Sequence, residues 1–367
     1  MKDGTRIVRA GVPESEQGAP FLPGPVFAAP FHLHGDPESS EFQYGRYGNP
    51  TWSRYEAALG ELDGGEAVLF ASGMAACAAV LIGLLRPGGA LVLPSDCYMS
   101  VRGIAQDHLS PWGVHVTAIP TAALAPDQLP DRLDLLWLET PSNPRLDACD
   151  VAELSAAAHE RGALVAVDNT FPTPIGQRPL ELGADLSVMS ATKHLSGHSD
   201  LLLGYVAAGD PELAERLRHW RSETGAIAGP FETWLAHRSL ATLQLRLQRG
   251  CANAQVIAEA LAARDDVPGV RYPGLPGDPA HELARRQMSL FGSVVAFDLG
   301  SRERAEAFLE RTRLVTESTS FGGVHTSAER RARWGRDEVP EGFIRLSAGC
   351  EHRDDLLEDV EQALGRA

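Results

Sequence analysis

The sequence predicts an α/β fold in which a parallel sheet is followed by a smaller α+β domain. Short, nearly continuous Val/Leu/Ala runs recur along the first part of the chain, with helical patterns between some of them. Such runs are typical of strands that are buried on both faces of a parallel sheet. The length of 367 residues fits about two domains, and an apolar fraction of 44% provides for a sizeable core.

The first 49 residues are expected to form an extended arm. Gly and Pro are frequent between residues 11 and 50, and six aromatic side chains are interspersed among them. A segment without regular structure buries such rings only against a surface, which is either the body of its own chain or a neighbouring subunit. We therefore assign residues 1–49 to an arm that lies outside the main core.

A large α/β domain is expected from residue 50 to residue 245. The run EAVLFA predicts a strand at 66–71, and GMAACAAVLIGLL predicts a buried helix at 73–85. Further strands are predicted at 90–94, 114–119, 135–138, 164–167, 186–189 and 201–207.

The remaining residues, 246–367, are expected to form the smaller domain. The pattern becomes helical over 233–264, which is long enough to link two domains. Strands and helices then alternate again, with strands predicted at 292–299 and 343–347 and helices at 302–313 and 353–364.

Composition argues against several classes of protein. With 33 basic and 49 acidic residues the formal charge is −16, which repels phosphate backbones, so no nucleic acid is expected as a partner. No apolar run reaches the ~20 residues that span a bilayer, and the opening residues MKDGTRIVRA lack the apolar core of a signal peptide. Five scattered cysteines without a CxxC pair fit reduced thiols. We expect a cytoplasmic protein that has no membrane partner.

Lysine usage singles out one residue. Of the 33 basic residues only Lys2 and Lys193 are lysines. Arginine can replace lysine as a solvated cation but not as a nucleophilic amine. Lys193 is therefore the first candidate for a chemical role.

Functional groups of open parallel sheets gather in loops beyond the carboxyl ends of the strands, and four such loops are unusually polar here. The first contains Ser72 and Gly73 before a helix, which can bind an anion or simply cap that helix. The second, ETPSNP at 139–144, is also explained by a rigid turn, and the third, Asp168 after LVAV, by a helix cap. The fourth, SATKHLSGH at 190–198, places the interior lysine among hydroxyl groups.

Other sites were weighed against these loops. His194 and His198 have the spacing of metal ligands on a helix, but Gly197 between them argues against a helix, and HExxH is absent, so no metal is expected. The sequence also lacks GxGxxG and GxxxxGK[ST], the glycine patterns of dinucleotide and nucleoside triphosphate sites.

Together the loops meet the requirements of pyridoxal 5'-phosphate (PLP). The Lys193 amine can form a Schiff base with an aldehyde, and the Asp168 carboxylate can hold a pyridine nitrogen protonated. Hydroxyl groups and a helix N-terminus can bind the phosphate dianion.

The chain resembles the PLP enzymes of cysteine and methionine metabolism, typified by cystathionine γ-synthase, cystathionine γ-lyase and methionine γ-lyase. The segment SFGGVHTSAERRARWG at 320–335 resembles actinobacterial chains called cystathionine γ-lyase. The other motifs that carry the resemblance are YGRYGNPT at 44–51, ASGMAA at 71–76, DCY at 96–98, ETPSNP at 139–144, VDNTF at 167–171, SATKHLSGHSD at 190–200 and FIRLSAGCE at 343–351.

The resemblance implies a PLP-dependent transferase fold of type I, like that of aspartate aminotransferase. In this fold a large domain with a mostly parallel seven-stranded sheet precedes a smaller α+β domain. The resemblance also implies a homo-oligomer, a tetramer of two catalytic dimers, in which the arm contacts the neighbouring subunit.

The resemblance further implies a role for each matching residue of the cofactor site. Lys193 binds the cofactor covalently, Asp168 pairs with its pyridinium nitrogen, and Tyr98 stacks on its ring and exchanges protons with the substrate. The phosphate-binding residues are implied to be Ser72, Gly73, Met74, Ser190 and Thr192.

The implied substrate is a sulfur-containing amino acid. Arg345 holds its carboxylate with Ser320 beside it, and Asn143 lies near both that carboxylate and the cofactor's phenolic oxygen. Tyr44 and Arg46 reach the phosphate of the neighbouring subunit, so the site would be complete only in an oligomer.

The expected reaction is γ-elimination of L-cystathionine to cysteine, 2-oxobutanoate and ammonia. Methionine or homocysteine γ-elimination and γ-replacement on an O-acylhomoserine remain alternatives, because Thr319 and the 324–335 segment depart from the family pattern where the distal end of the substrate should lie. The run at 329–333 within it is expected to be a solvated turn or helix face.

Two other classes of function were considered. A nicotinamide dehydrogenase shares the alternation of strands and helices but would carry the glycine fingerprint. A catalytically inactive relative would have lost Lys193, Asp168 or Arg345, and the sequence retains all three.

Overall fold

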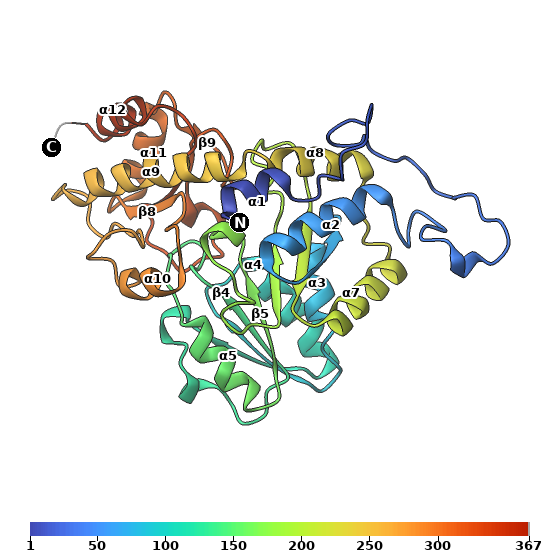
Figure 1. Ribbon diagram of the computed structural model, residues 1–367. Coiled ribbons are helices and arrows are strands. Elements are labelled where there is room, and N and C mark those ends of the chain that lie inside the picture. Colours follow the sequence, from blue (N-terminus) through green and yellow to red (C-terminus); the bar gives the residue numbers. More distant parts are fainter. Residues whose placement is uncertain (366–367) are drawn as a thin grey trace.

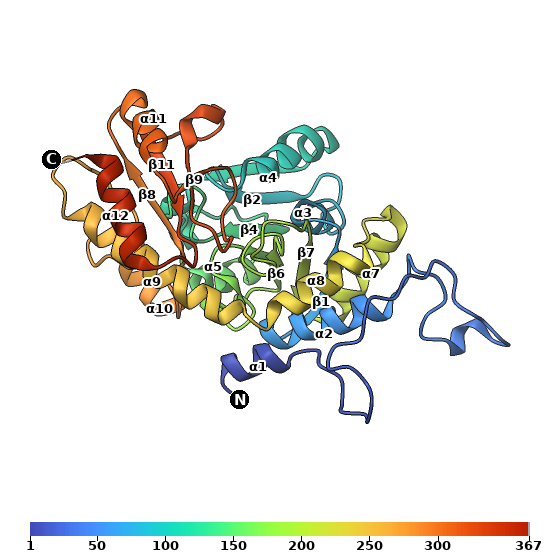
Figure 2. The ribbon, with the colours of Figure 1, turned by 90° about the horizontal axis from the view of Figure 1, so that it is seen from above.

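Two sheet-containing units make up the protein, one built on residues before about 240 and the other on residues after it (Figure 1). The structure is a computed structural model and describes residues 1–365. Figure 2, which views the molecule from above, shows the smaller unit beside the larger one, with helix α9 (Leu243–Ala262) running along it.

A seven-stranded sheet organises the larger unit. Its strands are β1 (Glu66–Phe70), β2 (Ala90–Pro94), β3 (His115–Ile119), β4 (Leu135–Glu139), β5 (Leu164–Asp168), β6 (Leu186–Met189) and β7 (Gly204–Ala208). They lie in the order β1-β7-β6-β5-β4-β2-β3, and only β7 runs antiparallel to its neighbours. The predicted α/β fold with a mostly parallel seven-stranded sheet is thereby confirmed.

The helices of the larger unit are α1 (Asp3–Arg9), α2 (Pro50–Asp63), α3 (Gly73–Leu81), α4 (Met99–Ile104), α5 (Val151–His159), α6 (Thr173–Gly176), α7 (Pro211–Thr224) and α8 (Pro230–Leu240). Helices cover both faces of the sheet because the side chains of its strands alternate between two apolar cores. Val68 and Phe70 face one core, which α3, α4 and α7 complete, whereas Ala67 and Leu69 face the other, which α2 and α8 complete. Near β4 and β5 the second face is covered by α5.

The smaller unit is a four-stranded sheet with helices packed against it, which confirms the predicted α+β domain. Its strands are β8 (Val294–Asp298), β9 (Thr316–Glu317), β10 (Ser327–Arg330) and β11 (Phe343–Ser347), in the order β8-β11-β10-β9. The remaining helices are α10 (His281–Gln287), α11 (Arg302–Arg311) and α12 (Arg353–Leu364). Helices α9, α11 and α12 share one apolar core with this sheet.

The helical pattern predicted over 233–264 forms two helices rather than one. Helix α8 ends at Leu240 and α9 begins at Leu243. At the break the carbonyl oxygen of Ser239 accepts hydrogen bonds from Thr242 Oγ1 at 3.1 Å and from Arg246 Nη2 at 3.0 Å. The same carbonyl accepts from the Thr242 backbone N–H at 3.2 Å, a bond from residue i+3 that ends α8 where a continuous helix would use the N–H of Leu243.

Four of the six aromatic side chains of the arm, those of Phe21, Phe27, Tyr44 and Tyr47, are exposed. Helix α1 packs against the body through the buried Ile7, and hydrogen bonds at Val26 and Arg46 tie the arm to the body, but much of the arm extends outward as an open loop (Figure 1). The exposed fractions are 88% for Phe21 and 71% for Phe27. Of the two surfaces that could cover the arm, the body of its own chain is therefore excluded for these rings.

Within residues 1–365, no helix has the length and apolar character that crossing a membrane requires.

Candidate active site

A cavity of about 400 Å³ lies where the parallel strands end, between the two units. Parallel strands bring their carboxyl ends to one edge, so the loops that follow them meet there. Eleven of the predicted site residues line this cavity: Ser72, Gly73, Met74, Tyr98, Asn143, Asp168, Ser190, Thr192, Lys193, Ser320 and Arg345.

The start of α3 forms one end of the cavity. Ser72 caps this helix, with its Oγ accepting from the Ala75 N–H at 3.1 Å. The N–H groups of Gly73 and Met74 have no partner within the described chain. A Cβ at Gly73 would lie 2.7 Å from the Cβ of Ser190, so only glycine fits between the helix and that loop. The arrangement is a cradle of N–H donors for an anion.

Two hydroxyl groups of the lysine loop have different roles. Thr192 Oγ1 donates to the Leu203 carbonyl at 3.1 Å and accepts from the Leu203 N–H at 3.0 Å, so it ties the loop to β7. The Ser190 backbone N–H donates to Thr170 Oγ1 at 2.9 Å and fixes the position of this residue. The Ser190 hydroxyl lies next to Gly73, beside the cradle. Ser190 is therefore better placed than Thr192 to bind an anion.

Two carboxylates lie side by side at the centre of the cavity wall. Glu139 and Asp168 occupy paired positions at the ends of β4 and β5. Glu139 accepts hydrogen bonds from the N–H groups of Tyr98 at 2.7 Å and Asn143 at 3.1 Å, and thus fixes both loops. Burial raises the pKa of Asp168, and burial together with Asp168 raises that of Glu139. Neither carboxylate forms an ion pair within residues 1–365, and the charge of the Lys193 amine offsets only part of the effect of burial on Asp168.

The Lys193 amine lies opposite these carboxylates. It donates to Ser320 Oγ at 2.5 Å, and the Ser320 backbone adopts a left-handed φ of 80° that turns its hydroxyl toward the amine. Burial, with the nearby Arg345, lowers the pKa of Lys193 to about 8. About a tenth of the amine is therefore unprotonated at pH 7, far more than for an ordinary lysine, and this neutral form can act as a nucleophile or base.

The Arg345 guanidinium forms the far wall. Its Nη1 donates to Asn143 Oδ1 at 2.7 Å and its Nη2 to the Ser320 carbonyl at 2.9 Å. Burial lowers the pKa of Arg345 to about 10, so the group keeps its charge at neutral pH. The Phe321 ring packs under the Arg345 guanidinium, with its centroid 5.5 Å from the guanidinium carbon. The same ring stacks on Phe171, with 4.3 Å between the two ring centroids. The result is a rigid carboxylate receptor.

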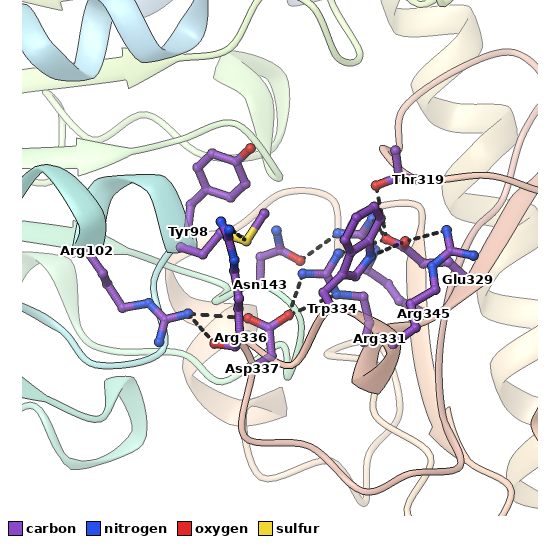
Figure 3. Close-up of polar contacts among 12 residues, drawn as sticks. Tyr98, Arg102, Asn143, Thr319, Glu329, Arg331, Trp334, Arg336, Asp337 and Arg345 are labelled. Carbon is purple, nitrogen blue, oxygen red and sulfur yellow. Dashed lines mark hydrogen bonds and ion pairs between the residues drawn. The ribbon is translucent and has the colours of Figure 1, made fainter. Parts of the chain in front are cut away.

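The sequence prediction for the run at 329–333 is wrong. Glu329, in strand β10, and Arg331, in the 3₁₀ turn that follows it, are only 0% and 4% exposed. Glu329 lies opposite Arg345 in the paired strands β10 and β11, and its Oε1 accepts a hydrogen bond from Arg345 Nη2 at 2.6 Å. Figure 3 shows this cluster with Trp334, which also lines the cavity. The only feature of the sequence that indicates this cluster is the departure of the 324–335 segment from the family pattern.

Tyr44 and Arg46 lie apart from the cavity within this chain. Arg46 Nη1 donates to the Ser222 carbonyl at 2.6 Å, and its guanidinium carbon lies 4.7 Å from the Tyr47 ring centroid. Tyr44 is 43% exposed. The structure therefore does not bring these two residues to the other predicted site residues of the same chain.

The cavity residues fit PLP. The open N–H groups at Gly73 suit a phosphate, the amine of Lys193 suits an aldehyde, and the ring of Tyr98 offers a stacking face. Asp168 and Glu139 form no ion pair within the described residues, and a protonated pyridine nitrogen would supply Asp168 with a cationic partner. A missing Cβ, two buried carboxylates without an ion-pair partner and an amine of lowered pKa thus fit one ligand.

Comparisons with known proteins agree with this geometry. The family model described as Cys/Met metabolism PLP-dependent enzyme matches residues 26–365. A Streptomyces coelicolor protein named "Putative cystathionine gamma-lyase" is 56% identical over 99% of this chain and 93% of its own length. The cystathionine gamma-synthase of Mycobacterium tuberculosis is 41% identical over 88% of this chain and 86% of its own. A crystal structure of a methionine gamma lyase from Micromonospora echinospora superposes with a TM-score of 0.91 at 39% identity, covering 100% of this chain and 99% of that one.

We predict that Gly73→Ala weakens cofactor binding. The added Cβ collides with Ser190 and displaces the N–H groups of the cradle, so the dissociation constant for PLP should rise by about tenfold or more. Titration of the apoprotein with PLP, followed by absorbance, measures this. Gly277→Ala is the control, because a Cβ at Gly277 would meet no atom within 4 Å and the residue does not have a left-handed φ; equal effects of both substitutions would contradict the assignment.

The depressed pKa of Lys193 predicts a pH dependence. Only the unprotonated amine captures an aldehyde, so the rate at which apoprotein binds PLP should rise with pH around a midpoint near 8 instead of 10.5. Arg345→Leu removes a neighbouring positive charge and should move the midpoint upward. Stopped-flow absorbance measures both, and Arg302→Leu, at an exposed arginine on α11, controls for net charge. A midpoint that Arg345→Leu leaves unchanged would contradict the electrostatic explanation.

Proposed function

The chain belongs to the Cys/Met metabolism PLP-dependent enzymes, and from that premise we propose that it catalyses γ-elimination of L-cystathionine. The products would be cysteine, 2-oxobutanoate and ammonia. As a member of this family of carbon–sulfur lyases and related enzymes it uses PLP. The observation that carries the proposal is the low-pKa amine of Lys193 held between a carboxylate receptor and the two buried carboxylates.

Substrate binding is assigned to the wall that faces Lys193. Arg345 holds the α-carboxylate of the amino acid through its fork of N–H donors, with Asn143 and Ser320 beside it. This anchor orients Cα toward the amine of Lys193. The Ser320 hydroxyl already holds that amine in place.

Proton movements are assigned to two side chains. PLP, when bound, supplies an aldehyde that takes up the substrate amine and a ring that accepts negative charge from Cα. Lys193 Nζ would remove the proton from Cα and, once it has given up that proton, would take the proton from Cβ, after which the γ sulfur leaves as a thiol. Tyr98 Oη or Lys193 Nζ gives the sulfur its proton, and one water molecule completes the release of ammonia and keto acid. Asp168 holds the pyridinium nitrogen.

Two related reactions stay as alternatives because relatives with these names are similar over most of the chain. One is elimination from methionine or homocysteine, and the Micromonospora protein is named a methionine gamma lyase. The other is γ-replacement on an O-acylhomoserine, the reaction class of the Mycobacterium synthase.

We also infer that the working unit is a homotetramer of two catalytic dimers in the cytoplasm. The exposed aromatic rings of the arm at 1–49 need a surface that their own chain does not offer. Tyr44 and Arg46 would then reach the phosphate of the neighbouring subunit. Residues 50–245 would bind the cofactor and residues 246–367 would complete the substrate site. The five cysteines, all free in the structure, fit a reducing compartment.

Lys193→Ala should abolish turnover, because no other amine lies in the cavity lining. Lys2→Ala, at the one other lysine, should retain wild-type activity. The measurement is 2-oxo acid release from L-cystathionine by protein incubated with PLP. Substantial activity in the Lys193 variant would contradict the mechanism.

A steady-state comparison tests the reaction itself. We expect kcat/KM to be highest for L-cystathionine among cystathionine, methionine, homocysteine and O-acylhomoserine with cysteine, each at fixed pH with PLP present. The products identify elimination or replacement. A clear preference for O-acylhomoserine plus cysteine would overturn the proposed lyase activity.

A further inference from the structure

The segment from Glu329 to Asp337 crosses from the small unit to the large one at the cavity. It begins at the end of β10 and continues through a 3₁₀ turn at Arg331–Trp334. Figure 3 shows its side chains reaching both Arg345 and the helix that follows Tyr98. We call it the 329–337 segment.

Glu329 is the hub of this segment. Its Oε1 accepts from Arg345 Nη2 at 2.6 Å and from Arg331 Nη1 at 2.8 Å. Its Oε2 accepts from Trp334 Nε1 at 2.9 Å and from Arg333 Nη2 at 3.2 Å. Burial would raise the pKa of Glu329, but these donors outweigh it and lower the pKa. One ionised carboxylate thus holds the carboxylate receptor and the indole in a fixed relation.

Asp337 ties the other end to the large unit. It accepts from Arg331 Nε at 3.1 Å and from Arg102 Nη2 at 3.4 Å. Arg102 lies in α4, the helix capped by Tyr98, and its Nη2 also donates to the Arg336 carbonyl at 3.0 Å. Contacts at both ends therefore fix the 329–337 segment across the cavity.

Trp334 presents apolar surface to the cavity. It lines the cavity together with Met99 and Leu202, and is 44% exposed. The guanidinium carbon of Arg333 lies 5.1 Å from its ring centroid. With its N–H bound to Glu329, the indole has one fixed orientation, and the surface that it leaves open faces the cavity beyond Arg345.

We propose that Trp334 determines which γ-substituent the enzyme accepts and that Glu329 is the positioning residue that sets Trp334 relative to Arg345. This rests on the proposed function only in that the substrate is an amino acid held by Arg345. The substituent favoured is a large thioether group that extends past the sulfur to reach the indole. A bare thiol or an S-methyl group is too short to use this contact.

The first test is Trp334→Ala, measured as the ratio of kcat/KM for cystathionine to that for homocysteine. Loss of the aromatic contact should lower kcat/KM about tenfold for cystathionine while homocysteine stays within about twofold. Active-site concentration is set from the cofactor absorbance. Trp112→Ala is the matched control, because Trp112 is a comparably exposed tryptophan, at 51%, that does not line the cavity.

The second test is Glu329→Gln. A glutamine has one acceptor oxygen, so it cannot accept from the Arg345–Arg331 pair and from the Trp334 indole at once. KM should rise for both substrates, and the cystathionine-to-homocysteine ratio should fall as it does for Trp334→Ala. A merely structural role would lower the yield of holoenzyme and leave the ratio unchanged.

An unchanged ratio in Trp334→Ala, or an equal loss for both substrates, would overturn the proposal. The outcome is separable from that of the proposed reaction. If the wild type does not eliminate from cystathionine but joins cysteine to O-acylhomoserines, the same ratio is measured between a large acyl group, succinyl, and a small one, acetyl. A ratio that falls in Trp334→Ala then supports the role of Trp334 although the lyase reaction is wrong.

Discussion

The parallel register of the large sheet is the constraint on which the site depends. Because β4, β5 and β6 run in one direction, Glu139, Asp168 and the loop that carries Lys193 emerge at the same edge. The helix start at Ser72 joins them, since β1 ends at that edge too. The small unit supplies what this edge lacks, a buried guanidinium at Arg345 that faces the amine. Residues far apart in the sequence thus form one cavity without a long ordered loop.

The charged groups around the cavity influence one another's protonation. The two carboxylates at the ends of β4 and β5 form no ion pair among the described residues, whereas Arg345 and Arg331 pair with Glu329, and Arg331 also pairs with Asp337. Arg345 stays charged because Glu329 offsets part of the cost of its burial, and its field helps to keep the Lys193 amine partly neutral. An anion receptor and a base can therefore work within one apolar enclosure.

The sequence predicted those features of the fold and site that depend on residues close together in the chain. Each buried strand of the large sheet reads as an apolar run, and the scarcity of lysine isolates Lys193. The break between α8 and α9 is invisible to periodicity, because it depends on hydrogen bonds that Thr242 and Arg246, one and two turns further on, donate to the Ser239 carbonyl. Glu329 and Arg331 look like a solvated run, since charges one or two residues apart reveal nothing of the partners that burial provides across strands. The role of Trp334 likewise depends on a partner that only the fold brings near.

The central claim is that Lys193 carries the cofactor, and the two lysines of the chain allow a direct measurement. Purified protein incubated with PLP would be reduced with borohydride, digested and analysed by mass spectrometry for the phosphopyridoxyl group. We expect that group on the peptide containing Lys193 and none on the peptide containing Lys2. A cofactor found on Lys2, or on neither lysine despite bound PLP, would contradict it.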